Sequence, residues 1–314
     1  MPNLTDLTLG MDLNEEFYST LKAKASSIQV RTFNLRDVRC PTPASSRHLV
    51  DALCSMPHLT DLRLYEGDLR EEFYSTLKAK AWSMQVQTLK LHVVWCPTRA
   101  SLHDLAEALC SMPNLTDLIL RMDFNEEFCS ALKANASSIQ VQTLKFEDVQ
   151  CPTPASSHHL AEALCSMPNL TDLILRMDFN EEFCSALKAN ASSIQVQTLK
   201  FEDVQCPTPD SSHHLAEALC SMPNLTDLIL RMDFNEEFCS ALKANASSIQ
   251  VQTLKLEDIQ CPTPASSHHL AEALCSMPNL TDLSLGMDLN EEFYSTLKAN
   301  ASSIQVCVSS CYSY

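Results

Sequence analysis

The sequence predicts an α/β solenoid, in which short parallel strands and helices alternate along one elongated array. Two observations predict this fold. The chain of 314 residues repeats itself at a fixed interval, and each repeat contains two strand-like segments that are each followed by a helix-like segment. The copies begin, 55 or 56 residues apart, at Leu4, Leu59, Leu115, Leu170, Leu225 and Leu280. Because such a repeat buries its apolar face only against its neighbours, we expect one array over residues 1–306, made of six double repeats with incomplete or divergent ends. Residues 307–314 form an off-pattern tail.

The first half of each repeat begins as a strand and continues as a helix. In the central copy, apolar and polar residues alternate over 117–121, which is typical of a strand with one buried face. We expect Leu118 and Leu120 to face the core. Asn125 can cap the helix that follows, and two acidic residues occupy its first turn, where the helix dipole is positive.

The second half repeats this order, but different residues end its strand and begin its helix. Leu144 and Phe146 have the same strand spacing, and a Cys-Pro-Thr-Pro segment over 151–154 ends the strand. Thr153 can cap the next helix, with Pro154 at its first position. We therefore expect eleven parallel strands that begin, within two residues, at Leu4, Val30, Leu59, Val86, Leu115, Val141, Leu170, Val196, Leu225, Val251 and Leu280.

These motifs carry a family resemblance. The LxxLxL spacing, present twice in each repeat with a helix after each occurrence, resembles leucine-rich repeats of the ribonuclease-inhibitor type. The phrases SHHLAEALCSMPNLTDL and SSIQVQTLKLEDIQCP resemble the C-terminal repeat arrays of NACHT–leucine-rich-repeat (NOD-like) immune receptors. The resemblance implies a horseshoe with parallel strands on its concave face and helices on its convex face.

The same resemblance implies a function in protein recognition. It favours the ligand-sensing or autoinhibitory region of an intracellular innate immune receptor. The alternatives are a free-standing adaptor or inhibitor of the ribonuclease-inhibitor type, an extracellular adhesion array and a metal-dependent enzyme. The sequence departs from the family pattern at Val149, where the family has a polar residue that bonds the turn, so we expect either looser turns in the second half or turns bonded by Thr153.

Composition limits the partners and the location. The net charge is −17 and is spread along the array, which argues against nucleic acid and anionic membrane as partners, since both need a basic footprint. Only three glycines occur, too few for a phosphate-binding loop. The first residues do not resemble a signal peptide, and the chain begins within a repeat. We therefore expect a cytoplasmic location and a fragment of a longer protein.

The 15 cysteines recur mainly in three columns, which are represented in the central copy by Cys110, Cys129 and Cys151. The column of Cys129 becomes Tyr18 and Tyr74 in other copies, which a disulfide partner could not do. Equivalent cysteines of successive repeats also lie about 10 Å apart if the strands stack in order, beyond the roughly 7 Å that a disulfide spans between Cα atoms. We expect these cysteines to be reduced.

The strand residues that face away from the core form the predicted binding surface, which lies on the concave face of the array. In the central copies they form an isoleucine column flanked by opposite charges, and in an outer copy Arg63 and Tyr65 replace this pattern. The predicted protein-binding residues are Arg63, Tyr65, Asp117, Ile119, Arg121, Lys145, Glu147, Asp172, Ile174, Arg176, Lys200, Glu202, Asp227, Ile229, Arg231, Lys255 and Glu257. Pairing of these charges with one another on neighbouring strands is the alternative interpretation.

Paired histidines on the predicted helices, such as His158 and His159, raise the question of a metal site. Neighbouring helical residues do not share a face, so one pair cannot chelate through both rings, and Arg47 replaces the first histidine in another copy. We predict no metal site and no cofactor. No nucleophile, base and orienting group occur together outside the repeat pattern, so we predict that the protein is not an enzyme.

Overall fold

A computed structural model describes residues 5–10, 13–93, 96–206, 208–257, 263–286, 291–300 and 305–308. The chain divides into two compact units. The first unit comprises Met1–Ala163 and Met167–Asn169, and the second comprises Leu164–Ser166 and Leu170–Tyr314. Each unit is built from strand–helix half-repeats.

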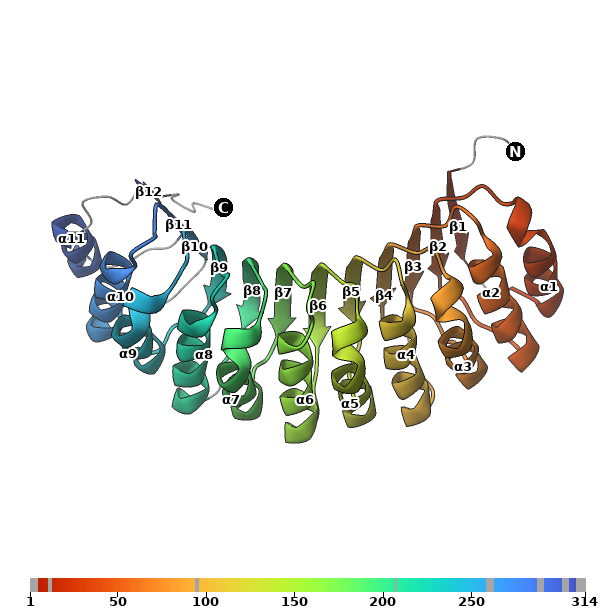
Figure 1. Cartoon of the computed structure of the whole chain (residues 1–314), viewed down its shortest axis with the longest axis horizontal. Coiled ribbons are helices and arrows are strands. Elements are labelled where there is room, and N and C mark those ends of the chain that lie inside the picture. Colours follow the sequence, from red (N-terminus) through yellow and green to blue (C-terminus); the bar gives the residue numbers. More distant parts are fainter. Residues whose placement is uncertain are drawn as a thin grey trace. The chain divides into compact units, whose positions relative to one another are not determined.

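The first unit contains one parallel sheet whose strands pair in sequence order. Its strands are β1 (Asp6–Gly10), β2 (Thr32–Arg36), β3 (Asp61–Tyr65), β4 (Thr88–His92), β5 (Asp117–Arg121) and β6 (Thr143–Val149). Its helices are α1 (Glu15–Lys24), α2 (Pro43–Ser55), α3 (Glu71–Lys80), α4 (Arg99–Ser111) and α5 (Glu126–Asn135), and α6 (Pro154–Cys165) crosses the boundary of the units. The helices α1–α5 form a layer on one side of the strands (Figure 1).

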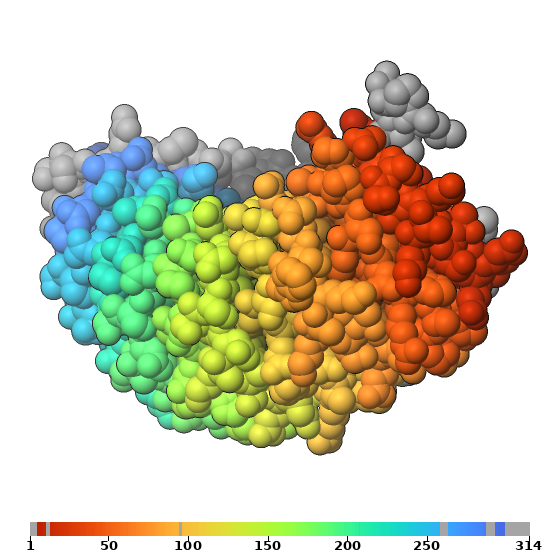
Figure 2. Space-filling model, turned by 45° about the vertical axis from the view of Figure 1, so that its right-hand side comes forward, coloured from red at the N-terminus to blue at the C-terminus, as the bar shows by residue number. Residues whose placement is uncertain are grey.

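The second unit repeats this arrangement. Its strands are β7 (Asp172–Met177), β8 (Thr198–Val204), β9 (Asp227–Met232), β10 (Thr253–Glu257), β11 (Asp282–Gly286) and β12 (Gln305–Val308). Its helices are α7 (Glu181–Asn190), α8 (Pro209–Ser221), α9 (Glu236–Asn245), α10 (Pro264–Ser276) and α11 (Glu291–Asn300). Within each unit the surface colours of Figure 2 follow the sequence order, as expected where a half-repeat contacts the one before and the one after it.

The predicted strand positions are confirmed. The strands β1 to β11 each begin two residues after the predicted leucine or valine, within the stated tolerance, although Leu4 itself lies outside the described residues. A further strand, β12, pairs in parallel with β11 and crosses the predicted start of the tail at residue 307. The sequence did not predict this strand because VCVSSCYSY lacks the LxxLxL spacing.

The predicted helix starts are confirmed as well. The side chain of Asn125 accepts a hydrogen bond of 2.8 Å from the backbone N–H of Phe128, at the start of α5. The hydroxyl of Thr153 accepts one of 3.1 Å from the backbone N–H of Ser156, with Pro154 as the first residue of α6. These bonds satisfy N–H groups that have no partner within the helix.

The core lies between the sheet and the helices. Leu118, Leu120 and Leu144 are at most 1% exposed, and Phe146 is fully buried, as the alternation predicts. The ring of Phe124 stacks on that of Phe128 with centroids 4.4 Å apart and meets Phe146 edge-on at 5.3 Å. Each strand therefore contributes the apolar side of its alternation to one apolar layer per half-repeat.

The turns after the second-half strands differ from the expectation built on Val149. Backbone N–H groups of left-handed residues bond the last carbonyl of the next strand: Asp37 (φ 50°) donates to Tyr65 over 3.0 Å, and Val93 (φ 53°) donates to Arg121 over 2.7 Å. The turns are thus closed by the backbone of the neighbouring half-repeat. Thr153 does not bond them, since its hydroxyl accepts the bond that caps α6.

Candidate functional site

The residues between the buried leucines lie on the surface of the sheet opposite the helices, which we call the outer sheet face. In the second unit the strand register places them in three rows. The first row contains Asp172, Thr198, Asp227 and Thr253, the central row contains Ile174, Lys200, Ile229 and Lys255, and the third row contains Arg176, Glu202, Arg231 and Glu257. Isoleucine and lysine therefore alternate from strand to strand, which the sequence alone did not show.

The isoleucines of the central row are half-buried, whereas we expected them to be fully exposed. Ile229 lies in register with Lys200 on one side and Lys255 on the other, and Ile119 lies between Lys90 and Lys145. The long methylene stems of lysine cover apolar neighbours while the ammonium group stays in water. The row thus presents narrow apolar strips between cations.

Most predicted charged residues of this face have partners within the chain. Lys200 forms an ion pair of 2.8 Å with Glu202, two residues along the same strand, and Lys145 does so with Glu147 at 3.0 Å. Arg231 lies 3.1 Å from Asp203. The face is therefore largely neutralised by ion pairs within a strand or between neighbouring strands.

Asp148 and Asp203, near the ends of β6 and β8, are site residues that the sequence interpretation missed. Asp203 contacts both Arg176, at 3.7 Å, and Arg231, and Asp148 contacts Arg121 at 2.8 Å. Both aspartates have left-handed backbone conformations, with φ of 53° and 50°. Their position directly after the third row was visible in the sequence, but the irregular, left-handed strand end that brings them to the arginines was not.

The aspartates of the first row have a local structural role. Asp117, Asp172 and Asp227 each accept a hydrogen bond of 2.7 Å from the hydroxyl of the preceding threonine. These bonds fix the carboxylates at the start of each strand, so the first row is less free to contact a ligand than the central row.

The first unit carries a different set of side chains on the same face. Arg63 binds Asp61 over 2.6 Å, and the guanidinium of Arg36 lies 5.3 Å above the ring of Tyr65. The ring of Tyr65 meets His92 edge-on at 5.6 Å. Register places Lys90 beside Arg63 in the central row. Sequence reasoning identified Arg63 and Tyr65 but missed Arg36, Lys90 and His92, which belong to strands of the other half-repeat type.

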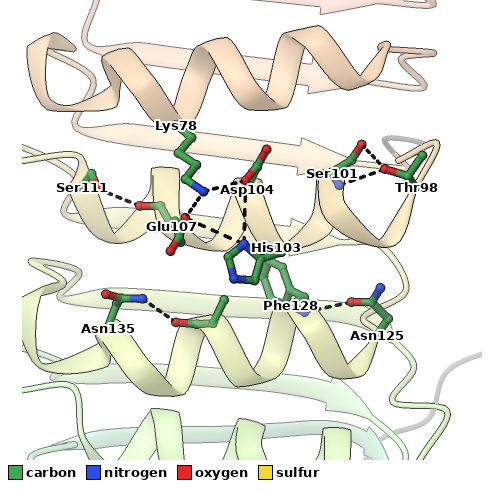
Figure 3. Close-up of polar contacts among 11 residues, drawn as sticks. Lys78, Thr98, Ser101, His103, Asp104, Glu107, Ser111, Asn125, Phe128 and Asn135 are labelled. Carbon is green, nitrogen blue, oxygen red and sulfur yellow. Dashed lines mark hydrogen bonds and ion pairs between the residues drawn. The ribbon is translucent and has the colours of Figure 1, made fainter.

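The paired histidines and their equivalents in other repeats lie on the helices, away from the outer sheet face. His103, Asp104 and Glu107 on α4 have ligand atoms within 4.8 Å of one another. The ammonium of Lys78, on α3, contacts Asp104 at 2.9 Å and also contacts Glu107, so it balances both carboxylates (Figure 3). The equivalent His158 lies 3.4 Å from Glu162, which binds Lys133 at 2.5 Å. The arrangement is a repeated surface ion-pair network.

The twelve cysteines whose side chains the structure describes are free thiols. The expected spacing of about 10 Å concerns equivalent cysteines of successive repeats, whereas the structure brings two different columns together. Cys129 hydrogen-bonds Cys151, and Cys184 hydrogen-bonds Cys206. In the outer copy a tyrosine takes this place, and the hydroxyl of Tyr18 donates to the carbonyl of Arg39 over 3.0 Å. Cys129 and Cys184 are buried, whereas Cys151 and Cys206 are half-buried.

Burial also sets the acidity of the remaining thiol column. It raises the pKa of Cys110 and of Cys220 to about 12 each. Such thiols are protonated and weakly nucleophilic at neutral pH.

Among the described helices, none is long and apolar enough to cross a membrane.

No family model matches the sequence, and no curated protein matches it significantly. Among solved structures, the chain is similar to one in the complex of Rad7 and Elc1 from yeast, with 16% identity, a TM-score of 0.42, and coverage of 99% of this chain and 79% of that chain. It is also similar to TLR13 in a complex with the single-stranded RNA ssRNA13, with 13% identity and a TM-score of 0.42. That match covers 98% of this chain but only 50% of the TLR13 chain. The repeat motif, the sequential parallel register and the alternation of strands and helices define the fold as a leucine-rich-repeat solenoid.

Proposed function

We propose that this chain is a protein-recognition scaffold that binds a protein ligand on its outer sheet face. One observation carries the proposal. The core-facing strand residues stay the same between repeats, as with Leu62 and Leu118, while the central-row residue between two such leucines changes from Arg63 to Ile119. A constant frame with variable outward positions is the arrangement expected of a diversified recognition surface.

The finer assignment is the ligand-sensing or autoinhibitory repeat region of an intracellular innate immune receptor, which rests on the family resemblance of the repeats. The protein acts by binding and not by catalysis. The net charge of −17 favours a protein ligand over nucleic acid or an anionic membrane. Free thiols throughout the described chain support a reducing, cytoplasmic location.

The test replaces Ile119, Ile174 and Ile229 together by aspartate. Since these side chains are half-buried beside lysines, an aspartate there gains nearby cations, and the variant should keep its fold. Quantitative mass spectrometry then compares the proteins captured from host cytosol by the native chain and by the variant. A matched control replaces His158, His213 and His268 on the helices by alanine.

The expected result is that the isoleucine variant loses specific ligands which the histidine variant keeps. The same ligands captured equally by both variants would contradict the proposal. A second variant with alanine at the three isoleucines covers the case in which the aspartates prevent folding. The alternative of a free-standing inhibitor predicts a different result. This chain, expressed alone, would then capture one dominant protein partner at a fixed ratio of one partner to one chain.

A further inference from the structure

The outer sheet face differs in charge between the two units. Over β7–β10 in the second unit the three rows are balanced, with cations at Arg176, Lys200, Arg231 and Lys255 and acids at Asp172, Glu202, Asp227 and Glu257. Over β2–β5 in the first unit the cations are Arg36, Arg63, Lys90 and Arg121, and the acids are Asp61 and Asp117. The three rows over β2–β5 therefore carry more cations than acids in a protein whose net charge is −17.

The change is concentrated in the third row, where arginine and glutamate alternate in the second unit. In the first unit Arg36 and His92 take positions that Glu202 and Glu257 hold on equivalent strands. The adjoining turns do not cancel the difference. Asp37 has an equivalent acid in Asp203. Glu66 is an additional acid, since the second unit has Met177 and Met232 there, but exposed Val93 replaces the acid that follows β4, so the number of adjoining acids does not rise.

Two of the cations have no carboxylate partner in the part of the chain that the structure describes. Arg63 is bound by Asp61, and Arg121 is bound by Asp148. By contrast, no ion pair joins Arg36 or Lys90 to a described acid: Arg36 rests on the ring of Tyr65, and Lys90 lies in register between Arg63 and Ile119. Both are available to an incoming anion.

The aromatic rings of this face are engaged by their neighbours. The guanidinium of Arg36 covers the Tyr65 ring, the Tyr65 ring meets His92 edge-on, and a nitrogen of Arg121 lies 2.9 Å from a ring nitrogen of His92. Binding of single-stranded nucleic acid needs open aromatic faces on which bases can stack. The rings here instead hold the cations in place, which favours recognition of carboxylates.

We propose that the face formed by Arg36, Arg63, Tyr65, Lys90 and His92 binds a short acidic peptide segment, with one carboxylate at Arg36 and a second at Lys90. This inference rests on the proposed function and names the chemistry of its ligand. The strands β2 and β4 are two strand spacings apart, and the two cations differ by two residues along the strand, which together give a separation of about 12 Å. An extended peptide bridges that distance with carboxylates about four residues apart. A long polyanion is disfavoured by the overall negative charge.

The experiment uses the full chain and a fluorescein-labelled peptide of glycine and serine that carries two glutamates four residues apart. Its twin carries glutamine at both positions, and a thymidine oligonucleotide serves as the nucleic-acid probe. Fluorescence anisotropy at low ionic strength should show that the glutamate peptide binds about tenfold more tightly than its twin. The double variant Arg36→Glu, Lys90→Glu should abolish that difference.

The matched control is Lys24→Glu, Arg47→Glu, which makes the same change in charge on exposed positions of α1 and α2 in the same unit, away from the outer sheet face, and should leave peptide binding unchanged. Equal binding of the two peptides, equal loss in both double variants, or tighter binding of the oligonucleotide would each overturn the inference. The two proposals are separable. If the peptide does not bind but the isoleucine variant still loses its captured protein ligand, the recognition function stands and the acidic ligand is wrong.

Discussion

A matched pair of leucine substitutions tests whether stability in this array comes from nearest-neighbour packing. Leu228 in β9 and Leu7 in β1 occupy the same position of the repeat. Leu228 is 2% exposed and lies in register with Leu199 and Leu254 on the two flanking strands. Leu7 is half-exposed, and among the described residues it is in register with Phe33 alone.

The expected losses follow from burial. Leu228→Ala removes three buried carbons and leaves an enclosed cavity, which should lower the free energy of unfolding by about 2–5 kcal/mol. Leu7→Ala removes carbons that already meet water on one side, so about half of the transfer free energy, roughly 1 kcal/mol, should be lost without an enclosed cavity. The substitution in the middle of the unit should therefore cost at least twice as much.

Urea denaturation followed by circular dichroism measures both losses, and hydrogen exchange shows where each variant opens. Peptides from the central strands have nearly identical sequences and are hard to tell apart by mass. The substitution gives the peptide that contains Leu228→Ala a distinct mass, so its exchange can be followed separately. Accelerated exchange should be confined to β1 and its neighbour β2 in the Leu7→Ala variant. Equal losses in the two variants would refute the nearest-neighbour account.

Three further predictions concern local interactions. The hydrogen bond from Lys188 holds the pKa of Glu217 below its usual 4.5, so the pair stabilises the fold above pH 4.5 and stops doing so as the pH falls through the lowered pKa. Lys188→Met should therefore cost about 0–1 kcal/mol of unfolding free energy at pH 7 and nothing in acid. Thermal melts across pH measure this loss, and a loss independent of pH would contradict the prediction. Asn180 accepts a bond of 2.9 Å from the backbone N–H of Phe183 at the start of α7, so Asn180→Ala should cost about 1 kcal/mol in urea denaturation, whereas Asn180→Asp should cost much less. Mild oxidation with diamide should link Cys184 to Cys206, and mass spectrometry that instead finds Cys165 linked to Cys220 would show that the stacking is wrong.

Much of the fold was predictable because each half-repeat is locally consistent. The alternation around Leu118 and Leu120, the cap at Asn125 and the threonine–proline start at Thr153 each depend on residues close together in the chain. Local periodicity fixes which side of a strand is buried, since a shift of one residue would expose every leucine. The fixed interval between copies then determines that neighbouring strands are parallel and in sequence order.

The arrangement of the candidate site depended on contacts between half-repeats, which no single repeat specifies. The alternation of Ile229 with Lys200 arises only when strands of the two types lie side by side in register. In the same way, Asp203 reaches Arg231 from the strand end of the neighbouring half-repeat, and Cys184 meets Cys206 rather than its own equivalent.

The sequence by itself therefore determined the solenoid, its buried positions and the side of the sheet that faces outward, because these follow from periodicity along the chain. Only the tertiary structure decided which outward charges are neutralised and which, like Arg36 and Lys90, have no carboxylate partner among the described residues. The physical reason is that ion pairs form across distances of about 4 Å in space, and the register that sets those distances joins residues nearly 30 positions apart in the chain.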